Sequence, residues 1–310
     1  MIENKSQQEQ ELYDEVNLKE IFYVLWIGKK IILAVIAFFL LVSIIISLLL
    51  PNIYQSKALL NPVNEGGGLG TAFQSLSGLA AYGGVDIASM ENSQITDKAL
   101  EKLQSLSFFS NNILPNIYLP NLMAVKSWDS KTNTILYDKN IYDVSSNEWA
   151  RDFDFPQTQI PSAQESHEDF IDYFLEVTTN KKTGFISISI NHKSPFIAKE
   201  WVELIVEELN RFFITEDKSE AITAIEYLNE QMAKTRFTEV KEAIAELLQK
   251  KIQELTLMEA SNFYVLEYID PPVVMEEKAE PFRPTIIIVG SIIGLFLGII
   301  LVLLRKYFLK

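Results

Sequence analysis

Two long stretches without a charged residue stand near the two ends of the chain. The first, at residues 31–50, reads IILAVIAFFLLVSIIISLLL, and the second lies at residues 285–304, with twenty residues in each. Twenty helical residues extend roughly 30 Å, which is the thickness of the hydrocarbon core of a bilayer. The first stretch is longer than the apolar part of a cleaved signal peptide and follows a thirty-residue polar tail. We therefore predict two membrane-spanning helices that anchor the segment 51–284 between them.

The second apolar stretch contains three glycines at every fourth position, Gly290, Gly294 and Gly298. Residues four apart share one face of a helix, and small residues there allow another backbone to approach closely within a membrane. This face predicts a close helix–helix contact. Its partner could be the other span of this chain, a sister protomer or a different protein.

Shorter patterns divide the segment between the two predicted spans. Loose alternation of apolar and polar residues predicts strands at residues 53–60 and 264–269, and apolar residues at helical spacing predict a helix at residues 90–106. The sequence FLEVTTNKKTGFISISIN, at residues 174–191, alternates on both sides of a turn that ends at Gly184, which is typical of a β-hairpin. Together these elements predict an α+β domain.

The longest helical pattern begins at Ser194-Pro195, an N-cap followed by proline at the first helical position, and continues to residue 233. A turn at residues 235–238 separates it from a second helix that ends near residue 258. We expect the two helices to form a long antiparallel arm, at about residues 195–258. A helix of this length hardly buries its apolar stripe within one protomer, so we expect the stripes to be buried between protomers of a homo-oligomer. The stripe residues that we assign to this contact are Ile225, Leu228, Met232, Ile244 and Leu248.

Lysine and arginine next to the spans predict the orientation of the chain, because cytoplasmic flanks are enriched in both. Six such residues lie on the outer ends of the spans, before the first and after the second, against three on the ends that face the central segment. We therefore expect both the tail at residues 1–30 and the stub at residues 305–310 in the cytoplasm. Pro281 and Pro284 stand directly before the second span and predict a stiff membrane-proximal hinge.

The composition of the chain excludes several classes of function. The segment 51–284 carries 20 basic and 35 acidic residues, a net charge of −15, and repels polyanions at long range, so nucleic acid is a poor partner. The chain has no cysteine, which excludes disulfides and thiol catalysis. The glycine-rich stretch 65–84 lacks the Gly-Lys-Ser/Thr ending of a phosphate-binding loop and is better explained as a mobile loop. Nine aromatic residues at 108–155 fit either ordinary core packing, which we favour, or a platform for sugar rings.

Catalytic chemistry is poorly represented. The two histidines, His167 and His192, are not spaced as metal ligands, and we expect both at the surface. Asp152 and Asp154 could share one face of a strand as paired carboxylates, but such pairs arise by chance in so acidic a segment. We expect no catalytic residue, no cofactor and no metal site. The other alternative, a receptor that relays a signal, conflicts with two tails too small to transmit one alone.

Several stretches resemble the Wzz family of chain-length determinants, the bacterial polysaccharide co-polymerases of lipopolysaccharide O-antigen. They are KTGFISISINHKSPFIAKEWVELIVEELN at residues 182–210, YLNEQMAKT at 227–235, EEKAEPFRP at 276–284 with the glycine-bearing helix after it, and LKEIFYVLWIGKKIIL before and into the first span. The block at 182–210 is the most specific. The stretch 65–84 and the aromatic region match only loosely, and no residue roles are inferred there.

The resemblance implies an inner-membrane homo-oligomer whose periplasmic domain carries an extended helical arm and is anchored by two transmembrane helices. It implies a non-enzymatic regulator that sets the modal length of a glycan made by a separate polymerase, Wzy, with the growing glycan as a further candidate partner. A related branch adds a cytoplasmic tyrosine kinase after the second span, which we do not expect in a chain that stops at Lys310. The alternatives are a co-polymerase for capsule or enterobacterial common antigen, or a periplasmic receptor or tether.

Overall fold

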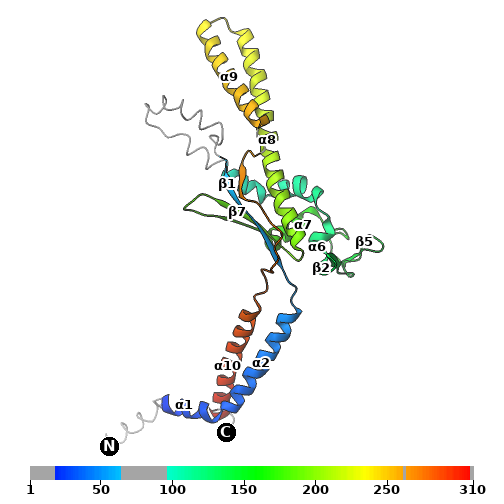
Figure 1. Cartoon of the computed structure of the whole chain (residues 1–310), viewed down its shortest axis with the longest axis vertical. Coiled ribbons are helices and arrows are strands. Elements are labelled where there is room, and N and C mark those ends of the chain that lie inside the picture. The colour runs from blue at the N-terminus through cyan, green and yellow to red at the C-terminus, as the bar shows by residue number, and fades with distance from the viewer. Residues whose placement is uncertain (1–17, 64–95, 261–262, 308–310) are drawn as a thin grey trace, which may run out of the picture. The chain divides into compact units, whose positions relative to one another are not determined.

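The computed structural model describes residues 18–63, 96–260 and 263–307, and Figure 1 shows the course of the chain. The glycine-rich stretch 65–84 lies outside the described residues. The chain forms two compact units. One consists of residues 1–52 and 279–310, and the other of residues 53–278.

The described residues of the first unit form the helices α1 (Leu18–Ile27), α2 (Lys29–Leu49) and α10 (Arg283–Tyr307). Helices α2 and α10 pack side by side along their length (Figure 1). Both are long and apolar enough to cross a membrane, with mean hydropathies of 3.2 and 3.1. They cover the two stretches in which the sequence predicts spans, except that α2 ends one residue earlier, at Leu49. The part of the predicted tail that the structure describes is also helical, because α1 begins at Leu18.

The second unit is built on a four-stranded antiparallel sheet with the strand order β6-β7-β1-β8. Its strands are β1 (Tyr54–Pro62), β6 (Leu175–Thr179), β7 (Ile186–His192) and β8 (Leu266–Asp270). The predicted hairpin is confirmed as β6 and β7, and it turns at Gly184, whose positive φ of 74° suits a residue without a side chain. On one face of the sheet, alternate residues of the two central strands are fully buried: Ala58, Leu60, Ile186, Ile188 and Ile190.

Helix α8 (Pro195–Lys234) covers that face with its first half and contacts both β1 and β7. Trp201, Ile205 and Leu209 recur at helical spacing and are buried, as the sequence predicts. Ser194 occupies the position before the helix, but its side chain makes no capping hydrogen bond, so only the proline at the first position follows the prediction. The core side chains from the sheet and α8 form one continuous cluster.

The segment between β1 and β6 adds several short elements, whose buried side chains belong to the same core. A helix at residues 96–103 replaces the longer one predicted at 90–106, whose first residues lie outside the described ranges. After it come α5 (Leu106–Phe108), π-helix η3 (Phe109–Ile113), 3₁₀-helix η4 (Leu114–Asn116), α6 (Leu119–Met123), β2 (Val125–Asp129), β3 (Thr134–Tyr137), β4 (Tyr142–Asp143), β5 (Glu148–Trp149), α7 (Ala163–Asp169) and π-helix η5 (Phe170–Phe174). β2 pairs with β3 and β4 with β5 as two small antiparallel ribbons.

The second half of α8 leaves the sheet, and α9 (Thr238–Ala260) returns beside it as an antiparallel arm (Figure 1). The turn between the helices spans residues 235–237, as the sequence predicts to within one residue. The predicted fold class, a mixed helix and sheet domain with a long helical arm and two apolar anchor helices, is confirmed.

Asn210, which the sequence does not single out, joins α8 to the entrance of β8. The side chain is buried, and its Nδ2 donates to the carbonyl oxygens of Val206 and Leu266, both at 3.0 Å. Its Oδ1 accepts from the backbone N–H groups of Tyr264, Val265 and Leu266 at 2.8–3.1 Å. One side chain therefore forms hydrogen bonds with four backbone groups of the returning chain, and buried backbone groups need such partners.

We expect Asn210→Leu to lower the free energy of unfolding by about 3 kcal/mol or more, because each buried backbone group left unpaired costs about 1–3 kcal/mol. The measurement is urea unfolding of the detergent-solubilised chain. Asn229→Ala, at an exposed position on the same helix, is the matched control. It should change the urea concentration at the midpoint of unfolding little. Equal shifts for the two variants would contradict the role of Asn210.

Candidate functional site: a glycine-lined helix pair and a helical arm

The three glycines of α10 lie against α2 of the same chain. A Cβ atom added at Gly294 would lie 3.0 Å from the Cβ of Phe39 and 3.1 Å from the Cα of Ile36. One added at Gly298 would lie 3.0 Å from the Cα of Ile32. Backbone atoms of α2 thus occupy the space that side chains would need. Of the three partners left open by the sequence, the structure shows the other apolar helix of this chain.

At Gly290 the close neighbour is a side chain instead of backbone. Ser43 Cβ lies 2.7 Å from the position of an added Cβ, and the Ser43 hydroxyl donates to the carbonyl oxygen of Phe39 at 2.8 Å. Ser43 and Ser47, four residues apart, are both buried in the contact face of α2. They are the polar residues of the first apolar stretch, and their spacing is the signal in the sequence that could have identified this face.

The two prolines assigned to the hinge lie at the start of α10. Pro284 is the second residue of the helix, where a missing N–H is tolerated, and Pro281 precedes the helix by two residues. Between them Arg283 donates from Nη2 to Asn52 Oδ1 at 3.3 Å, which links the beginning of α10 to the residues that follow α2. Whether the prolines act as a hinge stays a prediction.

The arm buries part of its apolar stripe within one chain. Ile244 and Leu248 of α9 are only 9% and 8% exposed, and Ile225, Leu228 and Met232 of α8 are half-buried. The expectation that a single protomer hardly buries this stripe is therefore wrong for Ile244 and Leu248, because α9 folds back against α8. Other apolar side chains of the arm remain exposed, namely Ile222, Tyr227, Phe237, Val240, Leu247 and Ile252. This second set is what the arm offers to a neighbour.

The prediction that both histidines lie at the surface is wrong for His192, which is 2% exposed. Its ring packs against the rings of Trp201 and Phe174, with centroids 5.2 and 5.8 Å away. Its Nε2 donates to the carbonyl oxygen of Asn121 at 3.0 Å, and its Nδ1 accepts from the backbone N–H of Ser194 at 2.9 Å. Both nitrogens are engaged, and burial lowers the pKa of His192 to about 4, so the ring is neutral at physiological pH.

The other candidate groups for catalysis are also accounted for. His167 is half-buried, with Nε2 2.9 Å from the carbonyl oxygen of Gln104 and its ring beside Phe109. Asp152 and Asp154 are exposed in a loop and not on a strand, so they are not a pair facing one site. Within the described ranges there is no group of three histidine, aspartate or glutamate side chains that could hold a metal ion.

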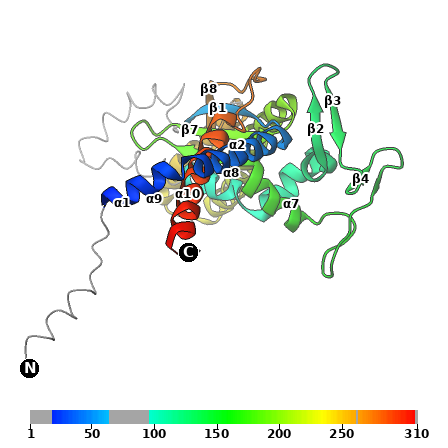
Figure 2. The same cartoon turned by 90° about the horizontal axis from the view of Figure 1, so that it is seen from below.

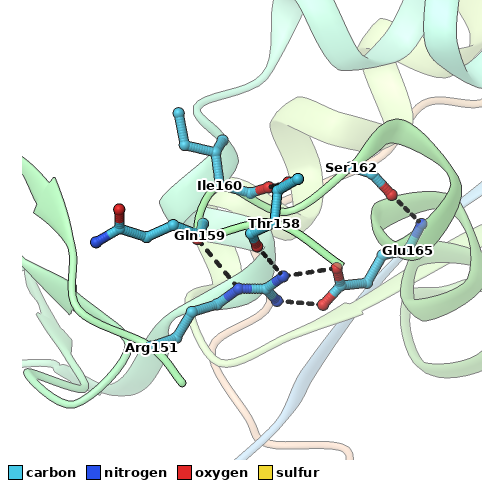
Figure 3. Close-up of polar contacts among 6 residues, drawn as sticks. All are labelled: Arg151, Thr158, Gln159, Ile160, Ser162 and Glu165. Atoms are coloured by element: carbon cyan, nitrogen blue, oxygen red, sulfur yellow. Dashed lines mark hydrogen bonds and ion pairs between the residues drawn. The ribbon is translucent and has the colours of Figure 1, made fainter. Parts of the chain in front are cut away.

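Arg151 closes the loop that contains these two aspartates (Figure 3). Its Nε donates to the carbonyl oxygen of Gln159 at 3.1 Å, and its Nη2 to that of Thr158 at 2.7 Å. Its guanidinium also forms a two-point ion pair with Glu165, in which Nη2 lies 2.8 Å from Oε2 and Nη1 contacts Oε1. Arg151 holds the pKa of the Glu165 carboxyl below its usual range. The arrangement is structural, because every guanidinium nitrogen meets an acceptor of the protein itself.

The nine aromatic residues divide between core and surface. Phe108 and Phe109 belong to the core, and Tyr142 is buried among the rings of Tyr118, Tyr137 and Trp149. Most of the rings therefore pack against one another, as ordinary core residues do. The exceptions are Phe153 and Phe155, which are 50% and 97% exposed in the loop closed by Arg151.

Two family models match the chain. The model for the chain length determinant protein, Wzz, matches residues 14–111, and a second model, described as a G-rich domain on putative tyrosine kinase (GNVR), matches residues 229–307. The chain thus contains a Wzz chain length determinant region and a GNVR region. Both helices of the glycine-lined pair lie within the matched regions, whereas the block at 182–210 lies outside them.

Two solved structures are similar to the chain at low identity. A full-length bacterial polysaccharide co-polymerase shares 12% identity, over 96% of this chain and 100% of that chain, with a TM-score of 0.40. A fragment of WzzB, a polysaccharide co-polymerase from Salmonella Typhimurium, shares 14% identity, over 74% of this chain and 100% of the fragment, with a TM-score of 0.32. Among curated proteins, none matches the chain.

We expect His192 to make the second unit less stable in mild acid. The pKa of His192 is lower in the folded chain than the ordinary value near 6.5, so the unfolded chain takes up the proton first as the pH falls. The stabilisation is complete above about pH 6.5 and is lost toward pH 4, a change on the order of 3 kcal/mol.

Urea unfolding of wild type and His192→Gln between pH 7 and pH 4 measures this effect. The difference in unfolding free energy between the two should shrink as the pH falls, because only the wild type loses the histidine contribution. His167→Gln, at the half-buried histidine, is the control. A difference that stays constant over this range would contradict the assignment of a neutral, buried His192.

Proposed function

We propose that this chain is a non-enzymatic regulator that sets the modal chain length of a surface polysaccharide made by a separate, Wzy-type membrane polymerase. Lipopolysaccharide O-antigen is the glycan that we favour. The observation that carries the proposal is the match of residues 14–111 to the Wzz chain length determinant model. The packed pair of apolar helices supports it, since such a regulator has to lie in the membrane beside the polymerase.

The absence of catalysis is part of the proposal. The two ring nitrogens of His192 are occupied by backbone groups, and the carboxylate of Glu165 is paired with Arg151, so neither is free to act as a general acid or base. What the chain does present is exposed apolar surface on the arm and a close-packed helix pair. Both features suit binding and assembly, and neither supplies chemistry.

We further propose an inner-membrane location with both ends of the chain in the cytoplasm. Residues 1–30 and 305–310 would then be cytoplasmic, 31–50 and 285–304 would span the bilayer, and 51–284 would form the periplasmic domain. The support is the excess of lysine and arginine on the outer flanks of the two helices. The protomers would assemble as a homo-oligomer, and the growing glycan would be a further partner.

The test is expression of the chain in a strain that lacks its own length regulator but keeps its polymerase. A gel of the surface polysaccharide should change from a random ladder to a ladder with a preferred length. Expression of the same chain in strains that make capsule or enterobacterial common antigen tests the alternative glycans. A ladder that stays random in all of them, with the protein present in the membrane, would favour the remaining alternative, a receptor or tether.

We expect Gly294→Leu to abolish length control without loss of the protein. Leucine favours the bilayer, so the chain still inserts, but its side chain would have to push aside the backbone of α2 at Ile36. Gly290→Ala should also loosen the pair, because Ser43 Cβ, which the backbone of α2 holds in place, would lie 2.7 Å from the added Cβ. The measurement is the ladder, scored for preferred length and not for total polymer, at equal protein abundance.

Leu295→Ile and Phe296→Leu are the controls for this experiment. Both residues are exposed on other faces of α10 and should leave the ladder unchanged. A wild-type ladder from Gly294→Leu at wild-type abundance would mean that the close approach of α2 and α10 does not matter for length control.

We expect Leu247→Glu to reduce the size of the oligomer while the arm itself stays folded. Leu247 is exposed on α9 and lies seven residues from exposed Val240, so the two share one helix face, whereas Ile244 is covered by the arm's own hairpin. Burying an unpaired charge between protomers would cost several kcal/mol. Sizing in detergent measures the species, and circular dichroism measures the helix content.

Ile244→Ala serves as the matched control for packing within the arm. It should lower the melting temperature but keep the oligomer, because the cavity lies between α8 and α9 of one chain. If Leu247→Glu left the size of the oligomer unchanged, the protomers would not contact one another through this face of the arm.

A further inference from the structure

Helix α1 presents a stripe of large apolar side chains that nothing in the described part of the chain covers. Phe22, Tyr23, Trp26 and Ile27 are 69%, 65%, 61% and 65% exposed. They lie at positions i, i+1, i+4 and i+5, which is one continuous face of a helix. Val24, by contrast, is buried. So large a group of exposed aromatic side chains on a ten-residue helix indicates an apolar or interfacial surrounding.

The junction between α1 and α2 fixes where this stripe lies. The chain turns at Gly28, where an added Cβ would be 2.4 Å from Cγ1 of Val302 in α10. Val302 is itself buried, and α1 contacts α10 directly. In both Figure 1 and Figure 2, α1 leaves the α2–α10 pair and extends away from it. Helix α1 is thus attached at the end of the helix pair and does not continue the course of α2.

The chemistry of the stripe matches the boundary between lipid and water. Tryptophan and tyrosine concentrate at this boundary because each combines an apolar ring with a polar group. The Phe22 and Trp26 rings stack with their centroids 6.3 Å apart, and Lys29 Nζ lies 4.7 Å from the centre of the Trp26 ring. Lys29 and Lys30 follow the stripe at once and can meet lipid phosphates.

We propose that α1 is an interfacial helix, which lies in the headgroup layer with Phe22, Tyr23, Trp26 and Ile27 turned to lipid. Gly28, packed on Val302, is the point at which the chain changes from this interfacial helix to the spanning helix α2. The proposal rests on the proposed placement of α2 and α10 across the bilayer, but not on any role in glycan synthesis. Continuity with these two apolar helices is what favours lipid over a protein partner, since the stripe begins where they end.

The absence of cysteine from the chain allows one probe to be placed at a time. Tyr23→Cys and Ile27→Cys are each labelled with the fluorophore NBD in the full chain, reconstituted in vesicles that contain phosphatidylglycerol. Quenching is measured with iodide in the water and with spin-labelled lipids at shallow and deep positions. We expect strong quenching by the shallow lipid label and weak quenching by iodide at both sites, because interfacial helices bury their apolar face about 5–10 Å deep.

Two further positions calibrate the measurement. A probe at Lys131, exposed in the turn between β2 and β3, should be quenched by iodide only. A probe at Phe38, exposed in the middle of α2, should be quenched most by the deep label. The double variant Phe22→Ser/Trp26→Ser should move the Tyr23→Cys probe toward the Lys131 pattern, since the remaining helix loses its aromatic contact with lipid.

Two outcomes would overturn the proposal. Iodide quenching at positions 23 and 27 equal to that at position 131 would place α1 in water. Protection from both iodide and lipid quenchers would mean that protein, such as a second copy of this chain, covers the stripe. Either result could coexist with a normal polysaccharide ladder, so failure here is distinguishable from failure of the proposed function. If the Phe38 probe were not quenched by the deep label, α2 itself would not span, and both proposals would fall.

Discussion

The close approach of α2 to α10 is the constraint on which the rest of the structure depends. This contact joins segments more than 230 residues apart. It is possible because Gly294 and Gly298 have no side chains, so that backbone atoms of Ile36 and Ile32 occupy the space beside them. In lipid the hydrophobic effect does not drive two apolar helices together, so dispersion contacts at short range have to supply the attraction. Any side chain larger than hydrogen at these positions therefore weakens the contact directly.

In the second unit, the two halves of the long helix α8 have different surroundings. The first half of α8 is apolar toward the sheet and is fixed by Trp201, Ile205 and Leu209. The second half packs against α9, and some apolar side chains, such as Ile222 and Tyr227, remain exposed. Asn210 lies near the boundary between the two halves and holds the chain that returns from α9 into β8. The arm is thus anchored at its base by hydrogen bonds and packing, and its free surface is available for assembly.

Most of the fold could be predicted from the sequence because it depends on long, regular patterns. Twenty uncharged residues, a hairpin with alternating isoleucines and a forty-residue helical periodicity each leave few alternatives. The errors arose where a contact between distant segments decides the environment. His192 is the last residue of β7, and only the fold shows that it lies against Asn121 and Trp201. Likewise, Ile244 becomes buried only because the turn at 235–237 brings α9 back onto α8.

The small residues of α2 and its junction with α1 were missed for a related reason. The glycines of α10 form a repeat that is visible in the sequence of one helix. Ser43, Ser47 and Gly28 form no such repeat, and their role is evident only when α10 lies against them.

The net charge of the segment between the two apolar helices sets a condition on the proposed assembly. A segment with a net charge of −15 repels its copies at the range of the Debye length, about 8–10 Å in physiological salt. Protomers of the proposed oligomer therefore need surfaces where short-range attraction exceeds this repulsion. Exposed apolar residues of the arm, such as Leu247 and Ile252, could supply such surfaces. Anchoring in a membrane assists them, because two-dimensional confinement raises the local concentration of protomers and so reduces the attraction that each contact has to provide.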